Sequence, residues 1–239
     1  MSFLSWSQAA VPPLAAPAVD GPGNPWFSWQ YVQDNADTVT TKLGFHIGIT
    51  VETVLIALLI AVPLAVVAYW IRPLTGPILA LSGVLYTVPS LALLALLAPL
   101  LGATNRNSVL IALVLYALLL LIRNALTGLT QVPADVKDAA AGMGYGRFGR
   151  LWHVELPLAL PGIVTGARLA TVSTVALVTV GGFIGQGGLG DLIMTGFRNN
   201  FYRAEITTGT VLCVTLALVF DLALVGVGRL LTPWTRRAA

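Results

Sequence analysis

Four ionisable side chains fall inside or at the edges of the long apolar runs of this sequence, and this placement limits what they can do. They are Glu52, Arg123, Arg168 and Asp221. Each costs at least about 2.5 kcal/mol at the centre of a bilayer, so each should face protein, water or a partner. If their runs are helical, Arg168 and Asp221 lie at depths that agree within about 3 Å, so we expect an ion pair. The open alternative is that Arg168 extends toward the polar boundary while Asp221 bonds a neighbouring hydroxyl.

Residue patterns that would support catalysis, metal binding or nucleotide binding are weak. His46 and His153 are far apart and lack neighbouring ligand residues, so we expect no metal site. Cys213 is the only cysteine, which excludes an intramolecular disulfide. Residues 144–149 and 185–190 both spell Gly-x-Gly-x-x-Gly, but that pattern binds a dinucleotide only between a strand and a helix of a parallel sheet. With no GxxxxGK[ST] phosphate loop either, we expect no cofactor on this chain and no enzymatic activity.

Composition places the chain in the membrane. Hydrophobic residues make up 56% of the 239 residues and charged residues 10%, whereas about 25% of a typical soluble domain is charged. The mean hydropathy is +0.85. The net charge of +3 comes from 13 basic residues scattered singly between apolar runs, without the basic stripe of a nucleic-acid-binding protein. We therefore expect an integral membrane protein in contact with lipid and not with nucleic acid.

Apolar runs near the roughly 20 residues that a helix needs to cross the hydrocarbon core predict an all-α, polytopic protein with about five transmembrane helices. The predicted spans are residues 47–71, 74–101, 108–122, 160–180 and 207–231. The third extends to Leu126 if Arg123 reaches the interface. Pro89 interrupts the second span, because proline removes a helix hydrogen bond, and it either kinks one helix or separates two shorter ones.

The distribution of basic residues predicts the orientation. With the N-terminus outside, eight basic residues lie on the cytoplasmic side and four outside, which is the bias found in the cytoplasmic membrane. The C-terminus is then cytoplasmic. The cytoplasmic set is Arg72, Arg123, Lys137, Arg147, Arg150, Arg229, Arg236 and Arg237, and the outer set is Lys42, Arg106, Arg198 and Arg203.

The N-terminal part of the chain differs from the rest. Residues 1–25 contain five prolines and lack the positive segment of a signal peptide, so we expect an extracytoplasmic tail. Trp26, Phe27, Trp29 and Tyr31 then predict an aromatic segment at the membrane boundary, or alternatively a ligand-stacking surface. The predicted domains are this tail with its aromatic segment, residues 1–45, and a transmembrane domain, residues 46–239.

A polar insert, residues 131–158, separates the third and fourth spans. Pro133 can occupy the first turn of a helix, and Gly144 can end it in the left-handed conformation. Val136, Ala139, Ala140 and Met143 fall at helical spacing and predict a narrow apolar face with small residues in its middle. A second helical piece should cover residues 147–154. Two short helices around a glycine turn can insert into a groove of another protein, although such a loop can also fold onto its own membrane domain.

The insert resembles the EAA loop of permease subunits of binding-protein-dependent ATP-driven importers. Asp138-Ala139-Ala140, Gly144 and Val154-x-Leu156-Pro157 match its spacing, with Asp for Glu and Val for Ile. The resemblance implies a second permease subunit, identical or not, two ATP-binding cassette ATPase subunits that hold ATP and Mg, and an extracytoplasmic solute-binding protein. It also implies a coupling site for the ATPase, to which we assign Asp138, Ala139, Ala140, Gly144, Arg147, Phe148, Arg150, Leu156 and Pro157.

Three further segments are similar to permeases for glycine betaine, choline, carnitine or proline. They are Tyr86 to Ala95, Leu121 to Asn124 and Phe183 to Asp191, of which the last is also similar to methionine importer permeases. The resemblance implies a type I importer fold and a translocation path between helices. We expect Pro89, Ser90, Gly185, Gly187 and Gly188 to form flexible or narrow points of that path.

The sequence therefore predicts a permease subunit that moves a small osmoprotectant by alternating access. Methionine or another small solute is the alternative cargo. A gradient-driven secondary carrier is the alternative mechanism, although such carriers often contain internal repeats and none is found here. An intramembrane enzyme is the third alternative, and the spans lack the paired acid and base that it would need.

Overall fold

The computed structural model describes residues 23–102 and 105–234, and every regular element in these residues is a helix. This confirms the predicted all-α fold. In chain order the elements are α1 (Trp29–Asp34), α2 (Ala36–Trp70), α3 (Arg72–Thr87), α4 (Ser90–Leu101), α5 (Arg106–Thr130), α6 (Ala134–Gly142), α7 (Arg147–Arg150), the π-helical turn η1 (Leu151–Glu155), α8 (Leu156–Val178), the 3₁₀ turn η2 (Thr179–Ile184), α9 (Leu189–Arg198) and α10 (Arg203–Leu231).

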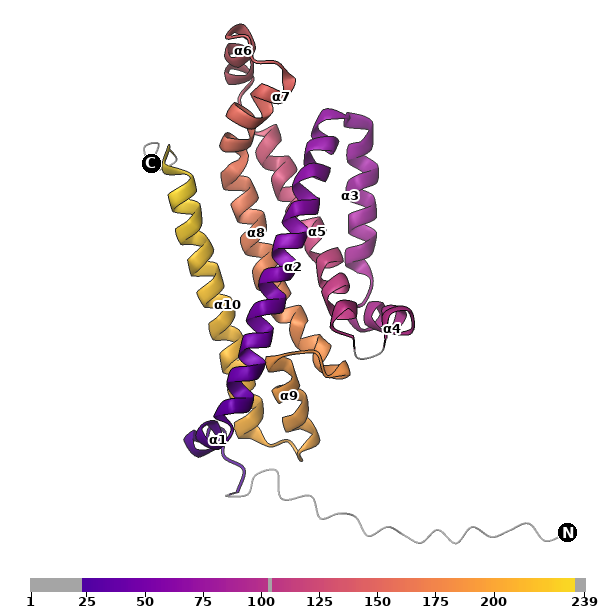
Figure 1. Cartoon of the computed structure of the whole chain (residues 1–239), viewed down its shortest axis with the longest axis vertical. Helices are drawn as coiled ribbons and strands as arrows, with labels where there is room; N and C mark the ends of the chain where they lie inside the picture. Colours follow the sequence, from indigo (N-terminus) through magenta and orange to yellow (C-terminus); the bar gives the residue numbers. More distant parts are fainter. Residues whose placement is uncertain (1–22, 103–104, 235–239) are drawn as a thin grey trace, which may run out of the picture.

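Long helices run side by side along the molecule and leave short elements at its two ends (Figure 1). Four helical stretches of the described residues are long and apolar enough to cross a membrane, or five if α3 and α4 together form one span. This matches the predicted count. At one end lie α6, α7 and the end of α10, and at the other lie α1 and α9 (Figure 1).

The first long helix begins earlier than predicted. Helix α2 starts at Ala36, whereas the apolar run was expected to begin at residue 47. Its first turns carry polar residues that pair with other elements instead of facing lipid, such as Lys42 with Asp191. The predicted domain boundary after residue 45 therefore falls inside a helix, and the expected tail of residues 1–22 lies outside the described residues.

Pro89 separates two helices and does not merely bend one. Helix α3 ends at Thr87 and α4 begins at Ser90, and their axes differ by 93°. The break leaves the carbonyl of Val88 without a helical partner, and the hydroxyl of Tyr116 on α5 donates a hydrogen bond to it. The alternative that the sequence left open is thus resolved in favour of two helices.

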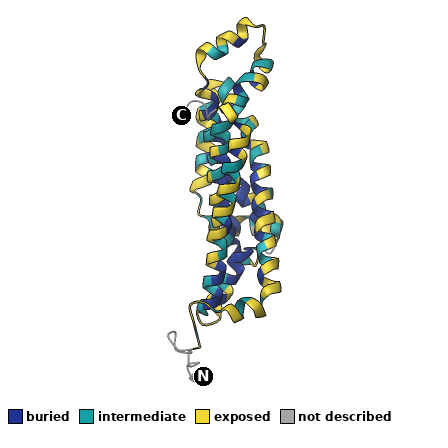
Figure 2. Ribbon diagram, turned by 90° about the vertical axis from the view of Figure 1, so that its left-hand side faces the viewer, coloured by how far each residue is buried: buried dark blue, intermediate teal, exposed yellow. Residues whose placement is uncertain are grey.

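Small residues let the central helices pack closely. One face of α2 presents Ala57, Ala61 and Ala65, all fully buried, against α5 and α8. Where α5 crosses α8, a Cβ on Gly162 would lie 2.9 Å from the Cα of Gly128. Close backbone approach of this kind is typical of helices packed inside membranes. The buried residues accordingly lie between the helices, and exposed ones cover much of the outer surface (Figure 2).

The aromatic segment before α2 folds over the start of α10. Ser28 caps α1 by accepting a hydrogen bond from the backbone N–H of Tyr31 at 3.1 Å. The ring of Tyr31 packs edge-to-face on Tyr202 at 5.6 Å. Burial and then the neighbouring carboxylate of Glu205 raise the pKa of Tyr31. The guanidinium of Arg203 lies 4.6 Å from the ring centre of Trp26. These contacts tie the predicted interfacial segment to the end of the helical bundle.

Candidate functional site

The insert between α5 and α8 projects from one end of the molecule (Figure 1). Pro133 precedes α6 as its N-cap residue, and α6 ends at Gly142. The chain then reverses at Gly144, whose φ of +85° is a conformation that residues with a side chain rarely adopt. The N–H of Tyr145 bonds the carbonyl of Ala140 at 3.1 Å and closes the turn. The two-helix arrangement around a glycine turn is the one that the sequence predicted.

Large apolar side chains on this projection are open to solvent. Met143 is 70% exposed, Phe148 68% and Trp152 67%. Soluble surfaces rarely carry several large apolar groups close together unless they bind something. The predicted apolar face of α6 is divided, since Ala139 is exposed and Ala140 is buried. The exposed part of this surface is therefore formed by the Gly144 turn, α7 and η1 (Leu151–Glu155) as much as by α6.

The charged residues of the insert differ in their partners. Asp138 is exposed, and no hydrogen bond or ion pair from it is present within the described ranges. Arg147 turns back toward α2, where it donates a hydrogen bond of 3.1 Å to the carbonyl of Trp70 and lies 4.5 Å from that ring's centre. Phe148 packs edge-to-face on the same ring at 4.9 Å. Asp138 is therefore free of polar contacts within the described residues, while Arg147 and Phe148 anchor α7 to α2, although Phe148 remains 68% exposed.

The sequence did not predict an ion pair beneath the insert, in which the carboxylate is buried and the arginine is partly exposed. Glu155 is 1% exposed and accepts a hydrogen bond of 2.7 Å from Nε of Arg150. Residues five apart do not share a face of an α-helix, but the π-helical turn η1 between them widens the spacing and aligns the two side chains. The second carboxylate oxygen of Glu155 has no protein partner among the described residues. A Glu one position before the predicted Leu156-Pro157 was the available signal.

Leu156 and Pro157 begin α8 directly after this turn. Leu156 packs against Leu129 and Leu151, which form a small core below the insert. Pro157 is the second residue of α8 and follows the π-helical turn η1 directly, so its missing N–H interrupts the hydrogen-bond ladder at the point where the helix changes from π to α. A movement of α7 therefore has a continuous helical path, through η1, into α8.

The predicted glycine-rich segment lies at the opposite end of the molecule. Residues Gly185 to Gly188 connect η2 with α9, and a Cβ on Gly187 would lie only 2.2 Å from the backbone nitrogen of Gly182. Gly188 lies against His46 in the same way, at 2.9 Å between the added Cβ and the Cβ of His46. This segment is a tightly packed turn, and the close approaches explain why its residues are small.

Lys42 and His46 of α2 hold this turn in place, and the sequence predicted neither role. Asp191 accepts hydrogen bonds from Nζ of Lys42 at 2.6 Å and from the N–H of Gly187 at 2.9 Å. His46 is fully buried. Its Nε2 lies 3.1 Å from the carbonyl of Val175, and its Nδ1 accepts from the N–H of Leu189 at 3.3 Å. The glycine turn is thus fixed to α2 through side-chain bonds at both of its ends.

Pro89 and Ser90 lie nearer to this end than to the insert. Ser90 lines a small cavity with Tyr116 of α5 and Val180 of η2. Leu93 and Leu94 of α4 pack in one core with Val178. The structure therefore brings the helix break and the start of the glycine segment into the same region, and α4 is the element that contacts both.

Arg168 and Asp221 form the ion pair expected from their depths. Nε and Nη2 of Arg168 lie 2.8 and 2.9 Å from the two carboxylate oxygens of Asp221, which is the bidentate geometry. The side chains are 37% and 30% exposed and border a cavity of about 180 Å³. Farther along the molecule, Arg106 bonds Glu52. Arg123 stays exposed on α5. Two of the four interior charges thus pair with each other.

Among the described residues, no group of three His, Cys, Asp or Glu side chains could hold a metal ion. The features that remain are mechanical: a projecting loop with exposed apolar residues at one end, a hydrogen-bonded glycine turn at the other, and long apolar helices between them. This is the organisation of a helical membrane protein with a loop that projects from one end.

Comparison with known families identifies the class. Residues 53–237 match the family described as binding-protein-dependent transport system inner membrane component, and the chain belongs to it. It is accordingly a multi-pass membrane subunit of a transport system. The match includes both the projecting insert and the glycine turn.

Individual relatives are close in length as well as in sequence. The chain is 37% identical over 205 residues to a choline transport system permease protein of Bacillus subtilis, which covers 85% of this chain and 93% of that protein. It is 34% identical to a glycine betaine/carnitine/choline transport system permease protein of the same organism, over 85% of this chain and 88% of the relative. It is 33% identical to an osmoprotectant import permease protein of Salmonella typhimurium, over 85% and 96% respectively.

Solved structures support the fold. A structure titled as inward-facing conformations of the MetNI methionine ABC transporter superposes with a TM-score of 0.72 at 20% identity, covering 83% of this chain and 98% of that chain. A second crystal form superposes with a TM-score of 0.71 at 23% identity. At this identity the likeness shows the fold of an ABC importer permease.

Proposed function

We propose that this chain is the permease subunit of an ATP-driven importer for a small osmoprotectant of the glycine betaine, choline, carnitine or proline type. The similarity to choline and glycine betaine permeases over 85% of the chain carries this proposal. The solute crosses by alternating access between two permease subunits, of the same or different sequence. An extracytoplasmic binding protein delivers it.

The projecting insert is the proposed coupling element. Exposed Met143, Phe148 and Trp152 supply an apolar contact surface, and Asp138 supplies a free charge at its edge. An ATP-binding cassette subunit, which holds the ATP and Mg, covers this surface and moves it during each cycle. The continuous helix from α7 through η1 into α8 carries that movement toward the membrane. The insert is then cytoplasmic, with the N-terminus outside and the C-terminus inside.

The proposed gate is the region where α4 meets η2, directly before the glycine turn. Pro89 and Ser90 break one wall, and residues Gly185 to Gly188 form a narrow turn held by Asp191 and His46. A cationic solute would pass most readily if no unpaired carboxylate trapped it. Two interior carboxylates are neutralised by arginine, Glu52 by Arg106 and Asp221 by Arg168.

Reconstitution tests the function directly. The chain, its ATPase and its binding protein are assembled in proteoliposomes, and uptake of labelled choline, glycine betaine, carnitine, proline and methionine is compared with and without ATP. We expect ATP-dependent uptake of one or more of the first four and no uptake of methionine. Methionine uptake alone would contradict the proposed cargo.

Vesicles that contain the chain alone test the rival mechanism, a gradient-driven secondary carrier. A sodium or proton gradient is imposed without ATP, with the chain alone in the membrane. A secondary carrier would accumulate solute under these conditions, whereas a permease subunit would not.

Asp138→Ala is the matched probe of the coupling site, because the side chain of Asp138 has no partner within the described chain. We expect it to lower transport while leaving the amount of folded protein unchanged.

A further inference from the structure

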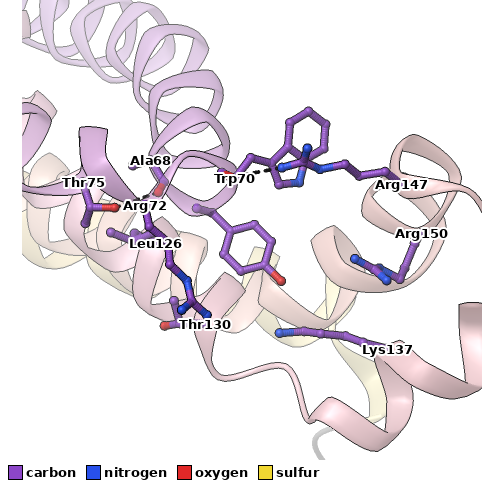
Figure 3. Close-up of a pocket in the computed structure, with 10 residues that line it drawn as sticks. Ala68, Trp70, Arg72, Thr75, Leu126, Thr130, Lys137, Arg147 and Arg150 are labelled. Carbon is purple, nitrogen blue, oxygen red and sulfur yellow. Dashed lines mark hydrogen bonds between the residues drawn. The ribbon is translucent and has the colours of Figure 1, made fainter.

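A cationic pocket lies between the insert and the start of α3, on the side of the insert that faces its own chain (Figure 3). Its volume is about 510 Å³. The walls are the end of α2, the beginning of α3, the end of α5 and parts of α6 and α7. The lining residues are Ala68, Tyr69, Trp70, Arg72, Thr75, Leu126, Thr130, Lys137, Arg147 and Arg150.

The charge of this pocket is of one sign. Arg72, Lys137, Arg147 and Arg150 line it, and none of the ten lining residues is acidic. Of the four, Arg150 is compensated by the buried carboxylate of Glu155. The remaining three have no carboxylate within ion-pair distance among the described residues. Such a concentration of positive charge around a cavity favours an anion.

Two of the cations lie against aromatic rings of the pocket wall, while the side chain of Arg72 is exposed. Nζ of Lys137 lies 5.2 Å from the ring centre of Tyr69, and the guanidinium of Arg147 lies 4.5 Å from that of Trp70. Thr75 donates to the carbonyl of Ala68 at 2.7 Å and fixes the corner between α2 and α3. Lys137 and Arg150 point from the insert toward the end of α2 (Figure 3). An anion entering here would meet two cations, Lys137 and Arg147, that the aromatic wall already positions, and an exposed Arg72 that is free to turn toward it.

The position of the pocket indicates the kind of anion. It opens where the apolar helix α2 ends, beside the aromatic residues Tyr69 and Trp70, which are typical of the headgroup level of a membrane. Ile71 and Leu74 at the same corner are exposed apolar residues that acyl chains can cover. Basic pockets between transmembrane helices at the cytoplasmic side are suited to lipid headgroups. A volume of about 510 Å³ exceeds the size of a bare phosphate and accommodates a phosphoglycerol group.

We propose that this pocket binds the phosphate headgroup of an anionic phospholipid, with Arg72 and Lys137 as its ligands from opposite walls. The phosphate then bridges the α2–α3 corner, which stays in the membrane, and α6, which belongs to the insert. A lipid bound there stabilises one position of the insert relative to the helices. This site goes beyond the proposed transport function, because its two proposed ligands, Arg72 and Lys137, are not among the residues assigned to the ATPase contact, although the pocket wall shares Arg147 and Arg150 with that set.

Native mass spectrometry of the full chain in detergent tests the site, using phosphatidylglycerol, zwitterionic phosphatidylcholine and inorganic phosphate as probes. We expect phosphatidylglycerol to bind and phosphatidylcholine not to bind. Each basic side chain near a phosphate contributes about five-fold to affinity, so the double variant Arg72→Gln/Lys137→Gln should bind phosphatidylglycerol at least about twenty-fold more weakly. Arg198→Gln is the matched control, since this exposed arginine lies on α9 at the other end and should leave binding unchanged.

Thermal unfolding without lipid verifies that the double variant is folded, and Arg72→Lys, which keeps the charge, should retain most of the binding. Equal binding by the double variant and the parent chain would overturn the proposal. Displacement of the lipid by millimolar inorganic phosphate would show that the pocket's ligand is free phosphate and not a lipid. Loss of lipid on assembly with the ATPase subunits would assign the pocket to a protein contact instead. None of these readouts involves solute or ATP hydrolysis, so their failure would leave the proposed transport function untouched.

Discussion

At the scale of single residues, the interior charges could be anticipated but not all of their partners. Arg168 and Asp221 were paired from depth alone, because a helix rises by a constant amount per residue and an unpaired charge is costly in an apolar medium. Glu155 and His46 were not anticipated. Their partners depend on a π-helical turn and on a contact between distant helices, neither of which has a pattern in the sequence.

The Arg168–Asp221 pair is testable by exchange of charges. We expect Asp221→Asn to lower the melting temperature in detergent, because Arg168 loses a bidentate partner and keeps its charge. The exchanged variant Arg168→Asp/Asp221→Arg should recover part of that loss, since the opposite charges again face each other. The single variants Arg168→Asp and Asp221→Arg each leave two like charges together. If the exchanged variant were no more stable than the sum of their losses predicts, the pair would contribute nothing to folding.

Replacing Glu155 by Gln should affect stability more than the same change in the exposed ion pair. The substitution removes a charge-assisted hydrogen bond from a buried side chain, and we expect a loss of about 1–3 kcal/mol. Glu52→Gln is the matched control, because Glu52 also pairs with an arginine but its side chain is 38% exposed. Thermal unfolding in detergent measures both. An equal effect of the two substitutions would contradict the role of burial.

At the scale of elements, the apolar runs predicted the long helices well and their ends poorly. The long spans follow from apolar runs, and the turn at Gly144 follows from the conformational freedom of glycine. The start of α2 was missed because its first turns are polar and are stabilised by pairing with α9, which hydropathy cannot register. The separation of α3 from α4 at Pro89 could not be predicted from the proline alone, because it also depends on Tyr116, whose hydroxyl donates a hydrogen bond to the carbonyl of Val88.

The glycine turn after η2 should not tolerate a side chain. A Cβ on Gly187 would lie 2.2 Å from the nitrogen of Gly182, so Gly187→Ala must displace backbone, and we expect a loss of about 3 kcal/mol or more. Gly48→Ala is the control, because nothing lies within 4 Å of an added Cβ there, and its stability should stay close to that of the parent chain. Thermal unfolding compares the two variants. Similar melting temperatures would show that the turn is looser than its contacts indicate.

At the scale of the whole molecule, the two ends have different characters. One end projects a loop with exposed apolar residues, and the other closes with a bonded glycine turn and an aromatic segment. The long helices join them. A displacement of the insert would therefore reach the other end through the packed long helices, where buried alanines and glycines let the backbones approach closely. The orientation of these two ends in the membrane decides from which side a partner could contact the insert.

That orientation can be measured with single cysteines. Cys213 is the only cysteine in the sequence, so Cys213→Ser provides a background without thiols. Phe27→Cys and Met143→Cys then introduce one reporter at each end, at sites that are 58% and 70% exposed. In spheroplasts, whose cytoplasmic membrane is intact, a membrane-impermeant maleimide should label residue 27 at once. It should label residue 143 only after the membrane is permeabilised. Labelling of residue 143 in intact spheroplasts would place the insert outside, where no cytoplasmic ATPase could reach it, and the coupling proposal would fail with it.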